Sequence, residues 1–163
     1  MPKGRFSKLS VLIADSSLYT GNIIASMLRT LDIHDVREAN DGRAALTELT
    51  LRAFDIILIE DSLAEIDGVE VVRRLRKSEE SGNRFKPVIM MAAAPDVARI
   101  AAARDAGVTE FLRKPFAASH IEARLIAIMD QPRDVVEAPS YVGPDRRRRK
   151  AGFDGGERRG ADE

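Results

Sequence analysis

The sequence predicts a doubly wound α/β domain, in which five parallel β-strands alternate with helices. Two observations lead to this class. Short runs of consecutive aliphatic residues recur along the chain, which is typical of strands buried on both faces of a parallel sheet. Each run is followed by a segment whose apolar residues recur every three to four positions, which is typical of a helix. Strict alternation of the two patterns predicts parallel strands joined by helical crossovers.

The segment 55–60 is the strand expected in the middle of the sheet. It reads Asp-Ile-Ile-Leu-Ile-Glu, with four consecutive aliphatic residues, and it ends in the acids Glu60 and Asp61. In open α/β sheets, ligands bind at the carboxyl ends of the strands, so these acids are candidate site residues. The other strands are expected at 10–14, 35–39, 87–92 and 110–113. The segment 35–39 is the most polar and is therefore predicted near an edge.

Helices are expected between these strands, and each has a recognisable start or stop signal. The start signals are Ser16 or Ser17 as the first N-cap, the Asn40-Asp41-Gly42 turn, Gly68, and Pro95 in a first turn. The stop signals are the break at Gly82-Asn83 and Gly107 at a C-terminal end. The last helix is expected from the apolar spacing of Ile121, Leu125 and Ile128.

The composition changes after Gln131. Proline and glycine become frequent, apolar side chains become rare, and basic and acidic residues are both dense and nearly balanced. We therefore divide the chain into a domain of residues 1–131 and an arginine-rich, flexible tail of residues 132–163, which cannot bury enough apolar surface to fold by itself.

Composition disfavours several classes of function. The chain has no cysteine and two histidines, which argues against a zinc site and favours a reducing cytoplasm. Its formal net charge is zero, which disfavours general binding to DNA. No apolar run approaches the ~20 residues of a membrane span, and the N-terminal residues lack the apolar region of a signal peptide. No catalytic constellation is evident, so we expect a protein that is not an enzyme.

Residues 9–130 resemble the receiver domain of bacterial response regulators, which has the flavodoxin/CheY-like fold. The resemblance rests on the motifs VLIADSS, EANDGRAAL, PVIMMAA and DAGVTEFLRKPF, and on the spacing of Asp55, Glu60 and Asp67-Gly68. In that family, two acids after the first strand help to hold Mg²⁺, and an aspartate after the third strand accepts a phosphoryl group. A hydroxyl after the fourth strand and a lysine after the fifth then bind the phosphate.

Carried over to this chain, the resemblance implies a degenerate phosphorylation site. Asp15 stands at the first acid position, and Ser16 replaces the second acid. Glu60 stands at the acceptor position, where its carboxylate lies one methylene, roughly 1.5 Å, further from the backbone than that of aspartate. Ala92 replaces the hydroxyl residue, and Lys114 is the family lysine. We expect no dedicated metal site, because Asp15 and Glu60 alone would hold Mg²⁺ weakly.

Two interpretations of Glu60 remain. It is either an inert replacement that pairs with Lys114, which we favour, or a fixed mimic of a phosphorylated aspartate. Asp61 is a less suitable acceptor, because a shift of one residue along a strand turns the side chain to the opposite face.

A short unit is repeated in the tail. Gly143-Pro144-Asp145-Arg146-Arg147 and Gly155-Gly156-Glu157-Arg158-Arg159 both place an acid before two arginines. Arginine can bond guanine O6 and N7 in bidentate fashion, and it also binds phosphate. A carboxylate can accept hydrogen bonds from the guanine N1–H and N2–H groups. Two such units suit cyclic di-GMP, which has two guanines and two phosphates.

This combination resembles the CheY-like cyclic di-GMP effectors of alphaproteobacteria, the Cle proteins, which act on the flagellar motor and on surface attachment. The resemblance implies cyclic di-GMP as a ligand rather than a catalytic cofactor, and a protein partner such as the flagellar motor switch. The expected ligand contacts are Asp145, Arg146, Arg147, Arg148, Glu157, Arg158, Arg159 and Asp162.

Three alternatives remain open from the sequence. The tail can be a solvated charged segment without a ligand. The protein can be a single-domain response regulator in a phosphorelay or in chemotaxis. It can also be a pseudo-receiver adaptor that binds another protein and no small molecule.

Overall fold

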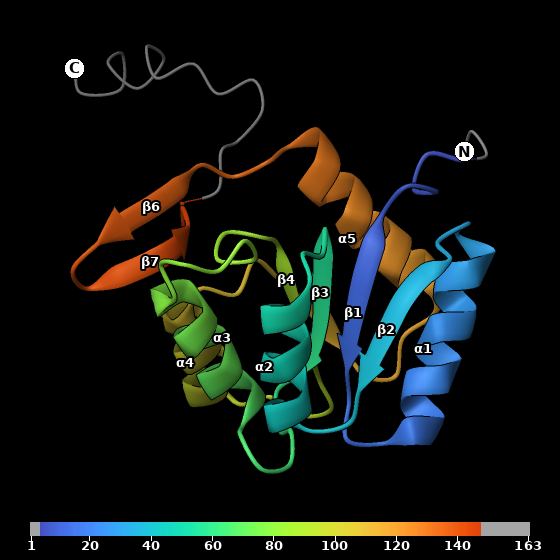
Figure 1. The fold of residues 1–163 in the computed structure, drawn as a ribbon, viewed down its shortest axis with the longest axis horizontal. Helices are drawn as coiled ribbons and strands as arrows, with labels where there is room; N and C mark the ends of the chain where they lie inside the picture. Colours follow the sequence, from blue (N-terminus) through green and yellow to red (C-terminus); the bar gives the residue numbers. More distant parts are fainter. Residues whose placement is uncertain (1–3, 148–163) are drawn as a thin grey trace, which may run out of the picture.

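The computed structural model describes residues 4–147 of the 163-residue chain. Five parallel strands form one sheet in the order β2-β1-β3-β4-β5 (Figure 1), which confirms the predicted doubly wound α/β class. Strand β2 lies at an edge, as its polar residues predict. The strands of this sheet are β1 (Ser10–Ala14), β2 (Asp35–Ala39), β3 (Ile56–Glu60), β4 (Val88–Ala92) and β5 (Glu110–Arg113). The helices are α1 (Leu18–Thr30), α2 (Gly42–Leu51), α3 (Gly68–Lys77), α4 (Val97–Ala106) and α5 (Ala118–Asp130).

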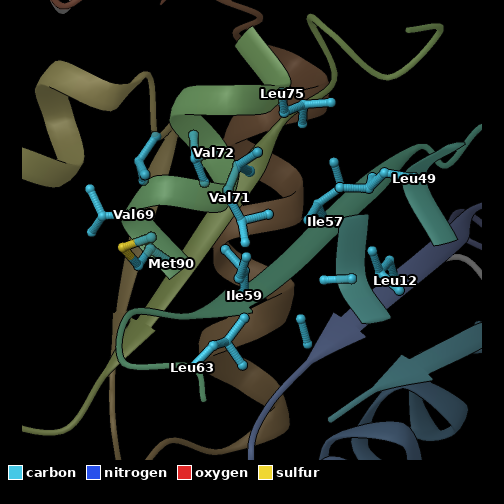
Figure 2. Packing of buried hydrophobic residues seen from close by; sticks show 14 of the residues in the cluster. Leu12, Leu49, Ile57, Ile59, Leu63, Val69, Val71, Val72, Leu75 and Met90 are labelled. Carbon is cyan, nitrogen blue, oxygen red and sulfur yellow. The ribbon is translucent and has the colours of Figure 1, made fainter. Parts of the chain in front are cut away.

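Helices cover both faces of the sheet. Successive residues of a strand point to opposite faces, so Leu12, Ile57 and Met90 pack against α2, α3 and α4 (Figure 2), whereas Ile13 and Leu58 pack against α1 and α5. Burial of each such aliphatic side chain contributes about 1.5–3 kcal/mol. The three central strands are therefore apolar on both faces, and polar residues gather at their ends.

Most helix signals act as the sequence predicts. The hydroxyl of Ser17 accepts a hydrogen bond from the Thr20 N–H at 3.1 Å and caps α1, and Gly107 ends α4 in the left-handed conformation. Pro95 differs from expectation, since it precedes the N-cap Asp96 and lies outside α4, and α3 ends at Lys77, before Gly82. Within residues 4–147, no helix combines the length and the apolar character that crossing a membrane requires.

The segment after Gln131 departs from the expected flexible tail, because its first part is folded. Strand β6 (Val135–Ala138) pairs with β7 (Tyr141–Pro144) in an antiparallel hairpin that lies beside α3 and α4 (Figure 1). Tyr141 is buried, and its hydroxyl donates a hydrogen bond to the Pro144 carbonyl at 2.7 Å. The composition argument considered the segment alone, whereas the receiver-like domain supplies the surface on which the hairpin packs.

The buried guanidinium of Arg76 organises the surface under the hairpin. Its N–H groups donate to the carbonyl oxygens of Gly107, Arg84 and Lys86 at 2.6–3.1 Å. Burial lowers the pKa of Arg76 to about 10, so the side chain is still charged at neutral pH. Gly107 lies so close to the hairpin that a Cβ there would be 2.8 Å from the Val142 carbonyl oxygen.

Three ion pairs join the hairpin region to the domain. They are Arg84–Glu137 at 3.0 Å, Arg133–Glu110 at 3.4 Å and Arg146–Asp105 at 2.6 Å. Each pair links a residue of the segment 133–146 to a residue of the domain, so the hairpin has a defined position on the domain.

Candidate functional site

Asp15, Glu60 and Lys114 meet at the carboxyl ends of β1, β3 and β5. The Lys114 ammonium donates to Asp15 Oδ2 at 2.6 Å and to Glu60 Oε1 at 3.1 Å. Parallel strands end at the same edge of the sheet, which is why residues 45 to 99 positions apart come together. The structure thus brings together the three charged residues that the sequence places at this edge.

The charges of this cluster are largely withdrawn from solvent. The side chain of Asp15 is 1% exposed, and those of Glu60 and Lys114 are each 18% exposed. Burial by itself would lower the pKa of Lys114, but hydrogen bonds from Lys114 to Asp15 and Glu60, together with the charges of both acids, outweigh it and raise that pKa above the ordinary value. Lys114 is therefore held as a cation between two carboxylates.

Ser16 closes the other side of the cluster. Its backbone N–H donates to Glu60 Oε2 at 2.9 Å, and its hydroxyl oxygen accepts from the Ala64 N–H at 3.1 Å. Both carboxylate oxygens of Glu60 are thus hydrogen-bonded, one to Lys114 and one to the loop after β1. Glutamate has one methylene more than aspartate, so its carboxylate reaches further from β3, to both Lys114 and the Ser16 N–H.

Ala92 lies at the end of β4, beside the cluster. It is buried, and its backbone carbonyl accepts a hydrogen bond from the backbone N–H of Lys114 at 2.9 Å. Ala92 therefore links the ends of β4 and β5 through its backbone. A methyl side chain cannot donate a hydrogen bond to an anion, so β4 contributes no side-chain donor at this position.

Asp61 belongs to a separate charged group. Arg99, in the first turn of α4, donates to the Asp61 carbonyl at 2.8 Å, to Asp61 Oδ2 at 3.4 Å and to Asp67 Oδ2 at 2.7 Å. The hydrogen bond to Asp67 is the main cause that raises the pKa of Arg99. The side chain of Asp61 is thus directed to Arg99, while Glu60 is directed to Lys114, as the alternation of side chains along a strand requires.

Sequence reasoning did not identify Arg99. The acids of the β3–α3 loop were evident, but their partner comes from a helix about 30 residues further along. The sequence shows an arginine near the start of α4, but it does not indicate which loop this arginine contacts.

The strand-end cluster does not suit Mg²⁺. Asp15 offers one oxygen to the Ser17 N–H at 2.9 Å and the other to Lys114, and both oxygens of Glu60 are also bonded. Mg²⁺ needs nearly octahedral oxygen ligands, and an ammonium 2.6 Å from Asp15 would repel it. In the part of the chain that the structure describes, no three His, Cys, Asp or Glu side chains are grouped to hold a metal ion.

Three of the predicted cyclic di-GMP contacts lie within the described residues. Arg146 bonds Asp105 of α4 at 2.6 Å, and its guanidinium carbon lies 4.2 Å from the centre of the Tyr141 ring. Arg147 bonds Asp145 through its backbone N–H at 3.0 Å and its side chain at 3.4 Å. The other predicted contacts, Arg148, Glu157, Arg158, Arg159 and Asp162, lie outside the described residues.

The two predicted sites lie at opposite ends of the sheet. The cluster around Lys114 is at the carboxyl ends of the strands, whereas the hairpin and Arg146 are beside the C-terminal ends of α3 and α4 (Figure 1). A ligand at one site would therefore not contact the other. Helix α4 forms an ion pair with the β3–α3 loop through Arg99 and another with the hairpin region through Asp105.

Comparison with known proteins identifies the family of the domain. The response regulator receiver domain model matches residues 11–126. Chemotaxis protein CheY-3 of Vibrio cholerae is 28% identical over 123 residues, which cover 76% of this chain and 93% of CheY-3. Chemotaxis protein CheY of Pseudomonas aeruginosa is also 28% identical, with 76% of this chain and 98% of CheY covered.

Solved structures agree on the architecture. Vibrio cholerae CheY4 superimposes with a TM-score of 0.66 at 25% identity, over 72% of this chain and 95% of CheY4. The receiver domain of a sensor histidine kinase from Pseudomonas aeruginosa, which holds a magnesium ion in its active-site cleft, has a TM-score of 0.68 at 24% identity, over 76% of this chain and 98% of its own. At that identity the second likeness shows the fold alone. Because the receiver model matches most of the chain and includes residues of every strand of the parallel sheet, this protein belongs to the response regulator receiver domain family.

Proposed function

We propose that this protein is a non-catalytic signalling effector whose input has moved from the strand ends to the C-terminal segment. In this proposal the receiver domain takes no phosphoryl group, and the two acid-Arg-Arg units bind cyclic di-GMP. The observation that carries the proposal is the folded hairpin, which fixes the start of the first unit against α4 through the Arg146–Asp105 pair.

The proposed loss of phosphorylation rests on the bonding of Glu60. Its two oxygens are already bound to Lys114 and to the Ser16 N–H, so Glu60 neutralises the cation that a phosphoryl group would need. Ala92 offers no hydroxyl, and Ser16 offers no carboxylate to a metal ion. Glu60 is in this view an internal partner of Lys114, the inert replacement rather than the mimic of a phosphorylated aspartate.

Mass spectrometry tests this part. After incubation with acetyl phosphate and Mg²⁺, we expect no stable acyl phosphate on the full chain. A labelled peptide that contains Glu60 and Asp61, and that persists when all other acids of the peptide are changed, would contradict it. Titration with Mg²⁺ adds a second check, since Asp15 and Glu60 should bind the ion poorly.

The proposed ligand site rests on the chemistry of the repeated unit. Arginine and a neighbouring carboxylate together match the acceptors and donors of guanine, and the remaining arginines match the phosphates. Asp145, Arg146 and Arg147 follow the hairpin directly, so the first unit starts from an ordered anchor and less conformational entropy is lost on binding. A protein target, such as the flagellar motor switch, can then bind the neighbouring surface of α4 and distinguish the ligand-bound form from the free form.

Calorimetry tests the ligand. Cyclic di-GMP should bind the full chain with a Kd of about 1 µM or below, and the double substitution Arg146→Gln and Arg147→Gln should abolish binding while the domain stays folded. Arg73→Gln and Arg74→Gln form a matched control, because they remove two arginines from α3 whose side chains are 42% and 53% exposed. A chain that ends at Gln131 should not bind, and one that ends at Arg147 keeps the hairpin with only the first unit. No heat from the full chain would contradict the proposal.

A second candidate is a pseudo-receiver adaptor that binds a protein and no nucleotide. It is favoured by the ion pairs of Arg146 with Asp105 and of Arg147 with Asp145, which already provide both arginines with carboxylate partners. The absence of binding in the same calorimetry, with the domain folded, would select it.

A further inference from the structure

The two partners of Arg146 hold different parts of its guanidinium. Asp105 accepts a hydrogen bond from Nη1, whereas the guanidinium carbon lies over the Tyr141 ring, 4.2 Å from the ring centre. Tyr141 is itself fixed by burial and by its hydrogen bond to Pro144. An incoming phosphate or guanine competes with Asp105 for Nη1 and for the positive charge of Arg146, but it need not displace the Tyr141 ring.

We infer that Asp105 is a gate on this site: it holds Arg146 in a self-bound form, and cyclic di-GMP binds by displacing the Asp105 carboxylate from Arg146. The inference rests on the proposed function and assigns its regulation to a residue of α4. In this inference, the loss of the Arg146–Asp105 ion pair is the change by which ligand binding affects the receiver domain.

Exposure makes this contact easy to open. The side chains of Arg146 and Asp105 are 43% and 67% exposed, so water screens their attraction. The cluster around Lys114 is buried in comparison, and removal of one of its partners would leave a charge without solvent. A ligand with two phosphates can therefore exchange for Asp105, but not for a member of the strand-end cluster.

Release of Asp105 acts on the end of α4. Asp105 lies in the last turn of the helix, where the backbone carbonyls make a carboxylate unfavourable. Arg146 offsets this repulsion in the self-bound form. Once the ligand binds Arg146, Asp105 has lost this cationic partner, and the last turn of α4 should unfold transiently more often. This turn ends at Ala106, directly before Gly107, which contacts the hairpin.

Calorimetry on full chains tests the gate with two substitutions that each remove one negative charge. Asp105→Asn frees Arg146, whereas Glu137→Gln breaks the Arg84 pair of the hairpin and leaves Arg146 bound. We expect Asp105→Asn to tighten cyclic di-GMP binding about two- to fivefold and Glu137→Gln to leave it unchanged. Amide hydrogen exchange in residues 103–106 should rise on ligand binding in the wild type, and this rise should be lost in Asp105→Asn.

The outcomes separate the inference from the function on which it rests. Equal affinities for the wild type and Asp105→Asn, or the same tightening in both variants, would overturn the gate and leave the ligand in place. Tightening confined to Asp105→Asn, with the loss of the exchange response, supports it. No binding by any of the three chains would overturn the proposed function, and the gate with it.

Discussion

At the carboxyl ends of the strands, Lys114 lies between Asp15 and Glu60 in a buried cluster, whereas at the opposite end Arg146 bonds Asp105 in an exposed pair. In each region a cation bonds a carboxylate at 2.6 Å, Lys114 to Asp15 and Arg146 to Asp105, and Lys114 also bonds Glu60. The two regions differ in their access to water, because Asp15 is 1% exposed and Asp105 is 67% exposed.

This difference determines what each region can do. A buried ion pair is costly to break, since the remaining charge is left without a partner. An exposed pair contributes little and exchanges readily for another partner. In the proposed function, the region that resembles a phosphorylation site is therefore part of the scaffold, and the exposed charges outside the parallel sheet are those that the ligand would contact.

The largest effect should come from the buried cation under the hairpin. Arg76→Met leaves the buried Gly107 carbonyl and the partly buried Arg84 and Lys86 carbonyls without their donors, and it should lower the free energy of unfolding by about 4 kcal/mol. Urea denaturation measures it. Arg74→Met, on the exposed side of α3, is the control and should change stability by no more than about 0.5 kcal/mol. A similar small change for Arg76→Met would show that the hairpin does not depend on it.

The next effect concerns the strand-end cluster. Lys114→Met leaves the buried Asp15 without its cationic partner and should cost about 3 kcal/mol, whereas Arg113→Met, at the neighbouring exposed residue, should cost little. The folded-state pKa of Lys114 is raised, so its stabilisation is complete below its unfolded pKa of about 10.4 and is lost as pH rises through the folded value. The difference between wild type and Lys114→Met should therefore shrink at strongly alkaline pH. A pH-independent difference would argue against a charged Lys114 as its cause.

A third test concerns the contact between the hairpin and α4. Gly107 has a φ of +107°, and a Cβ would lie 2.8 Å from the Val142 oxygen, so Gly107→Ala should cost about 2 kcal/mol. Gly82→Ala is the matched control, because a Cβ at Gly82 meets no atom within 4 Å. Thermal unfolding of the two variants compares them directly. Equal midpoints would mean that the hairpin does not rest on Gly107.

The smallest effect should come from Arg99. Its contacts with Asp61 and Asp67 are partly exposed, so Arg99→Gln should cost about 1 kcal/mol or less. Amide exchange at the start of α4 should nevertheless increase, because Arg99 joins α4 to the β3–α3 loop. Unchanged amide exchange at the start of α4 would show that Arg99 does not stabilise this end of the helix.

The parallel sheet could be predicted because its signals are local. The run 56–59 is aliphatic on both faces, and Gly107 marks the end of α4 in the sequence itself. The meeting of Asp15, Glu60 and Lys114 was also predictable, since the carboxyl ends of parallel strands share one edge.

The hairpin and the arginine contacts could not be predicted in this way. Tyr141 is buried against surfaces that α3 and α4 supply, which the composition of residues 132–163 does not reveal. The partners of Arg99 and Arg146 depend on the rotation of α4 and on the position of the hairpin. Both are properties of the packed molecule, and they decide which charges remain accessible.

The proposed movement of the signal input to the C-terminal segment can be tested most directly by amide NMR spectra of one full-length sample under two treatments. We expect cyclic di-GMP to shift the resonances of Tyr141, Asp105 and their neighbours, and acetyl phosphate with Mg²⁺ to leave those of Asp15, Glu60 and Lys114 unchanged. Shifts at the strand ends with the phosphodonor, together with none from cyclic di-GMP, would contradict the account.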